Sequence, residues 1–214
     1  MRKRILILNN HFISLYNFRK ELIKRLVDEG NEVFISISEA DRYNYFSEMG
    51  CRMIDTPVDR RGTNPIRDLG LILYYIRIMK KVKPDIIFSY TIKPNIYGCI
   101  ASNFTKNKQV VNITGTGATF LNKNIVSFIV KMLYKISVKR SYKIFFQNSG
   151  DRDYFVANNL VNNNFAMLPG SGVNLDQYAL CDLPPGGTTN FIFIGRIMEL
   201  KGIELYLEAA KIIK

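Results

Sequence analysis

The chain has 214 residues, of which 47% are hydrophobic and 22% charged, and its formal net charge is +12. Domains of roughly 100 to 200 residues are typical, so this length predicts one complete domain and part of a second. The apolar content excludes a disordered chain, and the charge favours a phosphorylated ligand, an anionic membrane surface or nucleic acid as partner. No dense Arg/Lys run and no known nucleic-acid-binding pattern occurs, so nucleic acid is not the expected partner.

Three widely spaced cysteines, Cys51, Cys99 and Cys181, match neither a disulfide framework nor a metal-binding pattern and favour a reducing cytoplasm. The apolar run after the basic start ends at Leu8 and is too short for a signal peptide. No run reaches the roughly 18 to 20 apolar residues of a transmembrane helix. We therefore expect a cytoplasmic protein, soluble or peripheral to a membrane.

Short β-type runs alternate with longer helical patterns over residues 1–170, which predicts βαβ units and a parallel sheet. The expected strands are residues 4–8, 32–37, 51–56, 85–89, 109–113, 143–147 and 165–168. The expected helices are residues 14–29, 41–49, 66–82, 94–103, 125–141 and 149–159, with Ser149 as the N-cap of the last. Phe18, Leu22 and Leu26 recur at helical spacing on one side of the first helix. The pattern predicts an α/β, doubly wound Rossmann-like domain.

Composition changes after residue 170. Residues 171–189 are rich in Pro and Gly and poorly periodic, which is typical of a linker. Residues 190–194 are expected to form a strand, followed by a turn and a helix over residues 201–214. Because one strand and one helix cannot bury a core, residues 190–214 are expected to be the truncated start of a second domain, or to be completed by a separate chain.

The sharpest local pattern is Gly195-Arg196 followed by Lys201-Gly202, between this strand and helix. Both cations would lie at the carboxyl end of a strand and beside a helix N-terminus, where open α/β sheets bind ligands and backbone N–H groups favour anions. The pattern predicts a diphosphate site. Two ordinary surface cations beside a turn would give the same spacing.

This segment resembles the donor-diphosphate motif of family 4 glycosyltransferases of the GT-B fold. Three earlier segments are similar to the same family, in the same order: residues 15–19 (LYNFR), 90–98 (YTIKPNIYG) and 114–117 (TGTG). The resemblance is strongest to enzymes that build capsule or lipid-linked oligosaccharides. It implies two facing Rossmann-like domains, the first for the acceptor and the second for a nucleotide-sugar donor.

The resemblance also implies roles for individual residues. Gly195, Arg196 and Lys201 would bind the donor diphosphate, with Arg196 and Lys201 as catalytic cations. The acceptor candidates from the resembling segments are Asn17, Arg19, Lys93, Gly115, Thr116 and Gly117. His11 is added as an acceptor candidate because it follows the first strand at the ligand-binding end of the sheet. Mg²⁺ would be unnecessary, because the two cations supply its charge.

Most of these acceptor candidates also have a simpler explanation. Gly115 and Gly117 permit positive φ and close approach of a ligand, but they also suit a tight turn. Lys93 and Arg19 could equally be solvated cations. His11, the only histidine, is a candidate base with an ordinary pKa of about 6.5. The resemblance implies instead that the departing phosphate assists the attacking hydroxyl.

No Gly-x-Gly-x-x-Gly follows the first strand and no His/Cys cluster has ligand spacing, so neither a dinucleotide cofactor nor a metal is expected. Helix 125–141 carries Lys131, Lys135 and Lys139 at i, i+4 spacing. A basic amphipathic helix can lie on an anionic bilayer, which predicts that these lysines face the membrane. A helix packed on the sheet with a solvated cationic side gives the same pattern.

The resemblance, together with these features, implies a retaining hexosyltransferase that works at the cytoplasmic face of the membrane. It would move a sugar from a UDP-linked donor to a lipid-linked saccharide in capsule or surface-polysaccharide synthesis. Two alternatives remain open. The chain could be an inactive acceptor-binding fragment or a subunit that needs a partner chain, or an enzyme similar to sugar-nucleotide 2-epimerases.

Overall fold

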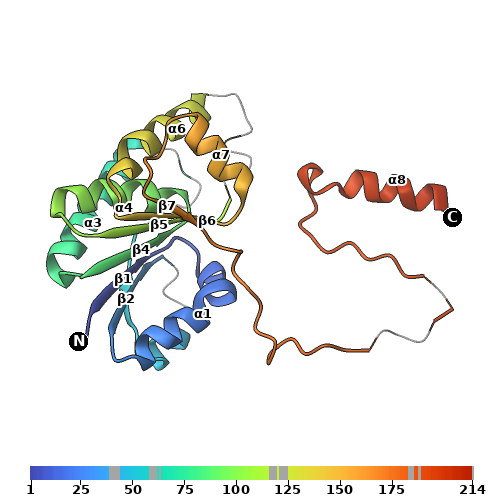
Figure 1. Cartoon of the computed structure of the whole chain (residues 1–214), viewed down its shortest axis with the longest axis horizontal. Helices are drawn as coiled ribbons and strands as arrows, with labels where there is room; N and C mark the ends of the chain where they lie inside the picture. Colours follow the sequence, from blue (N-terminus) through green and yellow to red (C-terminus); the bar gives the residue numbers. More distant parts are fainter. Residues whose placement is uncertain are drawn as a thin grey trace. The chain divides into compact units, whose positions relative to one another are not determined.

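The computed structural model describes residues 1–38, 44–57, 62, 64–115, 120, 125–182, 186–187 and 189–213. The chain divides into two compact units, Met1–Val173 and Asn174–Lys214. The first unit is a parallel sheet with helices on both faces (Figure 1). None of the described helices is long and apolar enough to cross a membrane.

Seven parallel strands form the sheet in the order β3-β2-β1-β4-β5-β6-β7. They are β1 (Arg4–Leu8), β2 (Glu32–Ile37), β3 (Arg52–Asp55), β4 (Ile86–Tyr90), β5 (Gln109–Ile113), β6 (Lys143–Phe146) and β7 (Phe165–Met167). In the centre, Ile7 of β1 pairs with Ile35 of β2 and Phe88 of β4. Strand β5 is buried along its whole length, as expected for a parallel strand covered on both faces. The α/β, doubly wound fold predicted from the sequence is confirmed.

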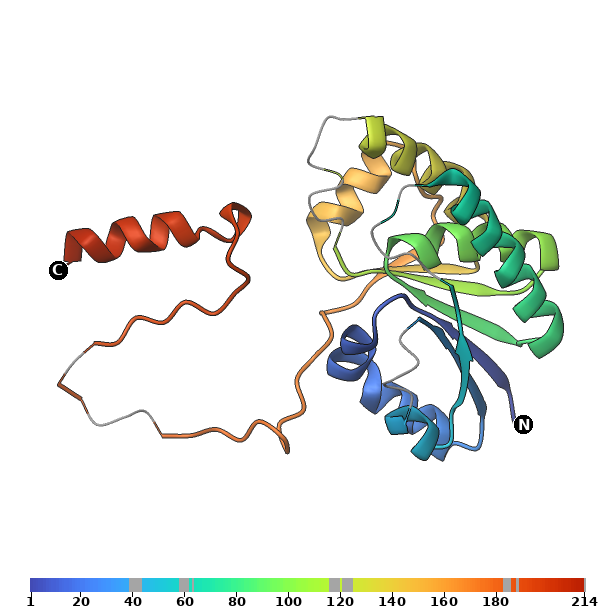
Figure 2. The same ribbon diagram turned by 180° about the vertical axis from the view of Figure 1, so that it is seen from behind.

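The helices of this unit are α1 (Phe12–Asp28), α2 (Asn44–Glu48), α3 (Pro65–Val82), α4 (Ile92–Thr105), α6 (Ile125–Ser137), which runs into the 3-10 turn η2 (Val138–Arg140), and α7 (Ser149–Ala157). α1 and α2 cover one face of the sheet, and α3, α4, α6 and α7 cover the other (Figures 1 and 2). The predicted N-cap of α7 is wrong by one residue. Asn148, not Ser149, caps this helix, because the Asn148 side chain accepts the backbone N–H of Asp151 at 2.7 Å.

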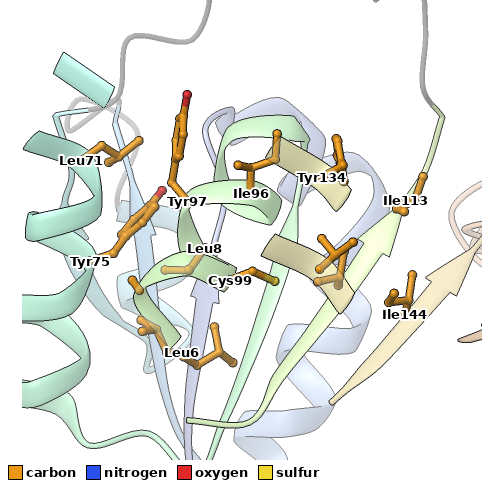
Figure 3. Close-up of a cluster of buried hydrophobic side chains, with 14 of the residues drawn as sticks. Leu6, Leu8, Leu71, Tyr75, Ile96, Tyr97, Cys99, Ile113, Tyr134 and Ile144 are labelled. Atoms are coloured by element: carbon orange, nitrogen blue, oxygen red, sulfur yellow. The ribbon is translucent and has the colours of Figure 1, made fainter. Parts of the chain in front are cut away.

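Two hydrophobic clusters lie on the two faces, since side chains alternate along each strand. Leu6 and Leu8 of β1 belong to the cluster under α3, α4 and α6 (Figure 3), and Ile5 and Ile7 belong to the cluster under α1 and α2. Helix α4 packs closely on the sheet at Gly98. A Cβ there would lie 2.8 Å from Leu8 Cδ1 and 2.9 Å from a side-chain nitrogen of Gln109, so only glycine allows α4 to lie this close to the sheet.

Helix α1 buries a different side from the one that its apolar spacing indicates. Leu15, Arg19 and Ile23 are buried, whereas Phe18 is 54% and Leu22 40% exposed. The buried row follows i, i+4 spacing, and the apolar row lies next to it on the helix surface. The helix therefore turns a charged residue toward the sheet and exposes a phenylalanine beside it.

The second unit contains the 3-10 turn η3 (Glu199–Lys201) and α8 (Ile203–Ile213). Residues 190–194 form no strand, which corrects the prediction. A strand needs a neighbour for its N–H and C=O groups, and the described residues of this unit hold no strand that could pair with it. The segment is held instead by α8: the Tyr206 hydroxyl donates to the Phe191 carbonyl at 3.0 Å, and its ring lies 5.5 Å from that of Phe193.

Candidate functional site

The strand order reverses between β1 and β4, because the chain builds outward from β1 on one side and from β4 on the other. Open α/β sheets bind ligands at such a switch point, outside the carboxyl ends of the strands. A pocket of about 250 Å³ lies there. It is lined by residues at or after four strand ends (Asn9, Tyr90, Thr91, Thr114 and Gln147), by Ser14, Phe18 and Arg19 of α1, and by Ser171.

Asn9 organises the turn from β1 into α1. Its side-chain oxygen accepts the backbone N–H groups of Asn10 at 2.6 Å and His11 at 2.9 Å, and its amide donates to the Ser14 hydroxyl at 3.2 Å. These bonds replace a conventional helix cap, because the His11 side chain makes no capping bond. His11 is half-buried at the start of α1 but does not line the pocket. The turn therefore presents Asn9 and Ser14, rather than the predicted histidine, to a ligand.

Arg19 is the charged group of the pocket, and it is only 9% exposed. Its guanidinium lies 4.9 Å from the ring centroid of Tyr90, and its Nη1 donates to the Phe18 carbonyl at 2.7 Å. Burial raises the pKa of Tyr90, and the nearby Arg19 charge acts in the opposite direction. Within the described part of the chain Arg19 has no ion-pair partner. A buried charge without a counter-ion is costly, so this cation favours an anionic ligand.

Thr91 supplies a second unusual feature at the same pocket. It is a β-branched residue at φ 72° and ψ 161°, a region that L-residues rarely adopt and that concentrates at functional sites. It precedes the first turn of α4. Among the residues that the structure describes, no side chain caps this turn, and the buried Thr91 hydroxyl has no hydrogen-bond partner. The pocket therefore holds a hydroxyl group and a helix N-terminus that are both available to a ligand.

Lys93, predicted to bind the acceptor, lies on another surface of α4. Its Nζ donates to Asp68 Oδ1 of α3 at 2.6 Å, and the Tyr97 hydroxyl donates to Asp68 Oδ2 at 2.7 Å. Burial and the neighbouring Asp68 raise the pKa of Tyr97. The lysine does not line the pocket. Its observed contact is an ion pair that joins α3 to α4.

The remaining acceptor candidates are divided. Gly115 directly follows Thr114, which lines the pocket, and its φ of +153° requires glycine. Asn17 is exposed on α1 and does not line the pocket. Thr116 and Gly117 lie outside the described residues. Of the predicted acceptor residues, the structure thus brings Arg19 into the pocket and places Gly115 next to it.

The predicted donor residues lie in the second unit. Arg196 is exposed in the bend after residue 194. Lys201 is the last residue of η3, and Gly202, at φ +71°, separates this turn from α8. The lysine therefore precedes the helix by two positions, instead of opening it as predicted. In this described part of the unit neither Arg196 nor Lys201 has an ion-pair partner.

The three lysines predicted to face a membrane differ from one another. Lys131 lies over the rings of Phe120 and Tyr154, with its Nζ 6.0 Å and 5.2 Å from their centroids. Lys139 donates to the Asn159 side chain at 3.3 Å. Lys135 is exposed. They do not form one solvated basic face.

Among the described residues no group of three His, Cys, Asp or Glu side chains could hold a metal ion. The sequence contains one Asp-x-Asp, Asp151-Arg152-Asp153, in α7. Its Asp153 carboxylate accepts from the Arg152 guanidinium at 2.8 Å, which lowers the pKa of Asp153. Independence from metals remains a prediction.

Several lining residues were not predicted from the sequence: Asn9, Ser14, Gln147 and Ser171. Asn9 and Gln147 follow strands directly, so their position at strand ends was a usable signal. Gln147 and Ser171 also contact each other, with 3.1 Å from Nε2 to Oγ. The position of Ser171 in the pocket could not be predicted locally, because Ser171 follows the last strand in a segment whose composition is typical of a linker.

A doubly wound parallel sheet with a pocket at its switch point, lined by Arg19 and several polar side chains, defines a Rossmann-like domain. The sequence profile of the family described as glycosyl transferase 4-like matches residues 4–148, well over half of the chain. The chain belongs to this family.

A relative from Campylobacter jejuni, N,N'-diacetylbacillosaminyl-diphospho-undecaprenol alpha-1,3-N-acetylgalactosaminyltransferase, is 26% identical over 180 residues, which cover 82% of this chain and 48% of the relative. A glycosyltransferase from Rickettsia africae has a similar structure, with a TM-score of 0.64, 18% identity and coverage of 86% of this chain and 47% of that one. Anabaena HepE in complex with UDP-glucose gives a TM-score of 0.58 at 12% identity, with 83% and 46% covered. The chain thus spans about half the length of these proteins, and the structures share its GT-B-type fold.

Proposed function

We propose that this chain is the acceptor-binding half of a glycosyltransferase that moves a hexose from a nucleotide sugar to a lipid-linked saccharide. Family membership and the pocket around Arg19 support this proposal together. The observation that carries it is a buried arginine, at the switch point of the sheet, that has no ion-pair partner among the described residues. The name of the Campylobacter relative describes a saccharide acceptor on diphospho-undecaprenol.

The pocket suits an acceptor that carries a diphosphate. Arg19 supplies a cation, and the uncapped first turn of α4 supplies backbone N–H groups and the positive end of a helix dipole. The Thr91 hydroxyl, which has no partner in the described structure, adds a donor. Asn9, Ser14 and Gln147 would then contact polar groups of the acceptor.

In the proposed reaction, a hydroxyl of the acceptor attacks the anomeric carbon of a UDP-linked sugar. The bond from that carbon to the diphosphate oxygen breaks, and the departing phosphate takes the hydroxyl proton, with retention of configuration. Arg196 and Lys201 neutralise the charge that develops on the leaving diphosphate. No cofactor or metal takes part, and the reaction occurs at the cytoplasmic face of a membrane, in the synthesis of capsule or another surface polysaccharide.

Two alternative functions can be distinguished from the proposed one by experiment. An acceptor-binding subunit or an inactive fragment would bind the acceptor without transferring a sugar. An enzyme similar to sugar-nucleotide 2-epimerases is disfavoured by the family match. In the tests below, the completed enzyme is this chain joined to, or expressed with, a donor-binding half.

The test is a transfer assay with UDP-hexoses and a diphospholipid-linked saccharide. We expect the 214-residue chain to bind the acceptor without turnover and the completed enzyme to release UDP and extend the saccharide. Turnover by the 214-residue chain alone would contradict the division of roles. Conversion of the sugar nucleotide into its 2-epimer, without extension of the saccharide, would contradict transfer.

A further inference from the structure

Helix α6 packs Val130 and Leu133 against the core but exposes most of its large apolar side chains. The small polar residues Ser127 and Ser137 are buried, at 2% and 0% exposure, together with Tyr134. Large apolar side chains of the same helix face the solvent: Ile125, Val126, Phe128, Ile129, Met132 and Ile136, at 44% to 78% exposure. An amphipathic helix on a sheet normally buries its apolar side, so this one needs another partner.

Five of these six exposed residues form one continuous stripe. At about 100° per residue, positions 125, 129, 132 and 136 fall within a narrow sector of the helix, and Phe128 lies at its border. The buried Tyr134 lies on the opposite side. α6 lies beside α4 in the layer that also contains α3 (Figures 1 and 2). Because Tyr134 is buried and the stripe residues are exposed, the stripe faces away from the core.

The charged residues of α6 and η2 themselves are of one sign. Lys135 and Arg140 are exposed, and no Asp or Glu occurs between residues 125 and 140. Lys135 lies beside the stripe on the helix surface, three positions after Met132. An apolar stripe beside cations complements a lipid surface that carries anionic headgroups, where the apolar side enters the acyl boundary and the cations remain with the phosphates.

The helix also lies at a suitable place for access to lipid-linked substrate. It follows β5, whose carboxyl end leads into Thr114 at the pocket. Because helices of a parallel α/β sheet run opposite to the strands, the N-terminal half of α6, with Phe128 and Ile129, lies toward the pocket edge. A bilayer at the stripe would thus be near the acceptor pocket.

We propose that the exposed apolar stripe of α6, rather than the lysine row, docks the protein on an anionic lipid bilayer. The choice of a bilayer as occupant rests on the proposed function, which needs an acceptor held in the membrane. Phe128 and Met132 enter the lipid, and Lys135 and Arg140 contact headgroup phosphates. Lys131, held over two aromatic rings, remains with the protein.

The absence of tryptophan from the sequence allows a direct test. Phe128→Trp places a single fluorophore in the stripe. Phe104→Trp is the matched control. Phe104 is similarly exposed, at 73% against 69% for Phe128, but it lies near the C-terminal end of α4 and outside the stripe. Each chain is mixed with vesicles of phosphatidylglycerol and phosphatidylethanolamine, with and without brominated acyl chains.

We expect the emission of Phe128→Trp to shift to the blue and to be quenched by brominated lipid, whereas Phe104→Trp shows neither change. Phe128→Ser combined with Met132→Ser should lower the vesicle partition coefficient by about tenfold or more, and Phe104→Ser should leave it within about twofold. An unshifted Phe128→Trp, or equal shifts of both variants, would overturn the proposal.

Two further outcomes identify another occupant and would also overturn it. A blue shift of Phe128→Trp that depends on protein concentration and needs no vesicles indicates a second copy of the chain. A shift that appears only when a donor-binding half is added indicates that this half covers the stripe. Circular dichroism of each variant verifies that the fold is unchanged.

The assay contains neither donor nor acceptor, so it separates this proposal from the proposed function. Lipid insertion at Phe128 without any sugar transfer by the completed enzyme would contradict the function and leave the docking intact. Transfer to a lipid-linked acceptor with no insertion at Phe128 would contradict the docking alone.

Discussion

The guanidinium of Arg19 lies 4.9 Å from the ring centroid of Tyr90 and thereby joins α1 to the end of β4. The two residues are far apart in the sequence and meet at the switch point, where the pocket opens. The arginine is buried, charged and without an ion-pair partner among the residues that the structure describes. This arrangement ties the proposed acceptor site to one side chain that can be tested.

We expect Arg19→Gln to weaken binding of a diphosphate-linked acceptor analogue by about 10 to 100-fold, since hydrogen bonds to charged groups contribute roughly 1.5 to 3 kcal/mol. Titration calorimetry on the 214-residue chain measures this affinity. Arg25→Gln is the control, because Arg25 is an exposed residue of the same helix that pairs with Glu29. Unchanged affinity in Arg19→Gln would leave Arg19 with a packing role only.

Gly98→Ala should destabilise the sheet unit by about 1 to 3 kcal/mol, because the new methyl group would overlap the buried side chains of Leu8 and Gln109. Gly70→Ala in α3 is the matched control. A Cβ there meets no atom within 4 Å, so the change should stabilise the helix by about 0.5 to 1 kcal/mol. Urea unfolding followed by circular dichroism gives both values, and equal effects at the two positions would show that α4 is not closely packed.

Stability should fall at alkaline pH, partly through Cys51. Burial raises the pKa of this thiol from 9.0 to about 11. The unfolded chain therefore releases the proton near pH 9 and the folded chain only near pH 11. The contribution is fully present below pH 9 and is lost as the pH rises toward and through 11.

Urea unfolding at intervals between pH 8 and 10.5 measures this slope. Buried Cys99 and several buried tyrosines, whose pKa values are also raised, add to it, so the difference between wild type and Cys51→Ala is the readout. The variant should have a shallower slope, by up to about one proton. Parallel slopes would mean that the Cys51 thiol ionises equally in both states.

In the completed enzyme, Arg196→Ala or Lys201→Ala should lower the rate of sugar transfer by about 10²-fold or more, as expected for loss of a preorganised charge. Lys211→Ala, an exposed cation within α8, is the control and should have little effect. Steady-state release of UDP measures the rates. Near-normal kinetics in both site variants would exclude the Gly195 to Gly202 segment from the donor site.

The sequence was sufficient for the regular part of the fold. Runs such as residues 5–8 are apolar without a break, and the helical segments between the strands have a longer period, so each element could be assigned from its own residues. Most predicted strands lie within one or two residues of the observed ones. The prediction failed at residues 190–194, where an apolar run has no neighbouring strand within its described unit.

The site depended on information that no local segment contains. Arg19 is an internal helix residue whose burial is set by how α1 lies on the sheet. The apolar spacing of the helix predicted instead that the side with Phe18 is buried. Lys93 looked equally available, but its charge is paired with Asp68, which precedes it by 25 positions. Long-range pairings of this kind follow from packing and not from periodicity.

By itself, the sequence determined a parallel α/β domain of the glycosyl transferase 4-like family, because alternating periods and short motifs are local properties. Only the tertiary structure decided which residues form the pocket and which side of α6 meets the solvent. The strand order places the ends of β1 and β4 side by side, and this adjacency brings Asn9, Arg19 and Thr91 together. The burial of Ser127 and the exposure of Phe128 likewise depend on the contacts of the folded chain, which an amphipathic pattern alone does not specify.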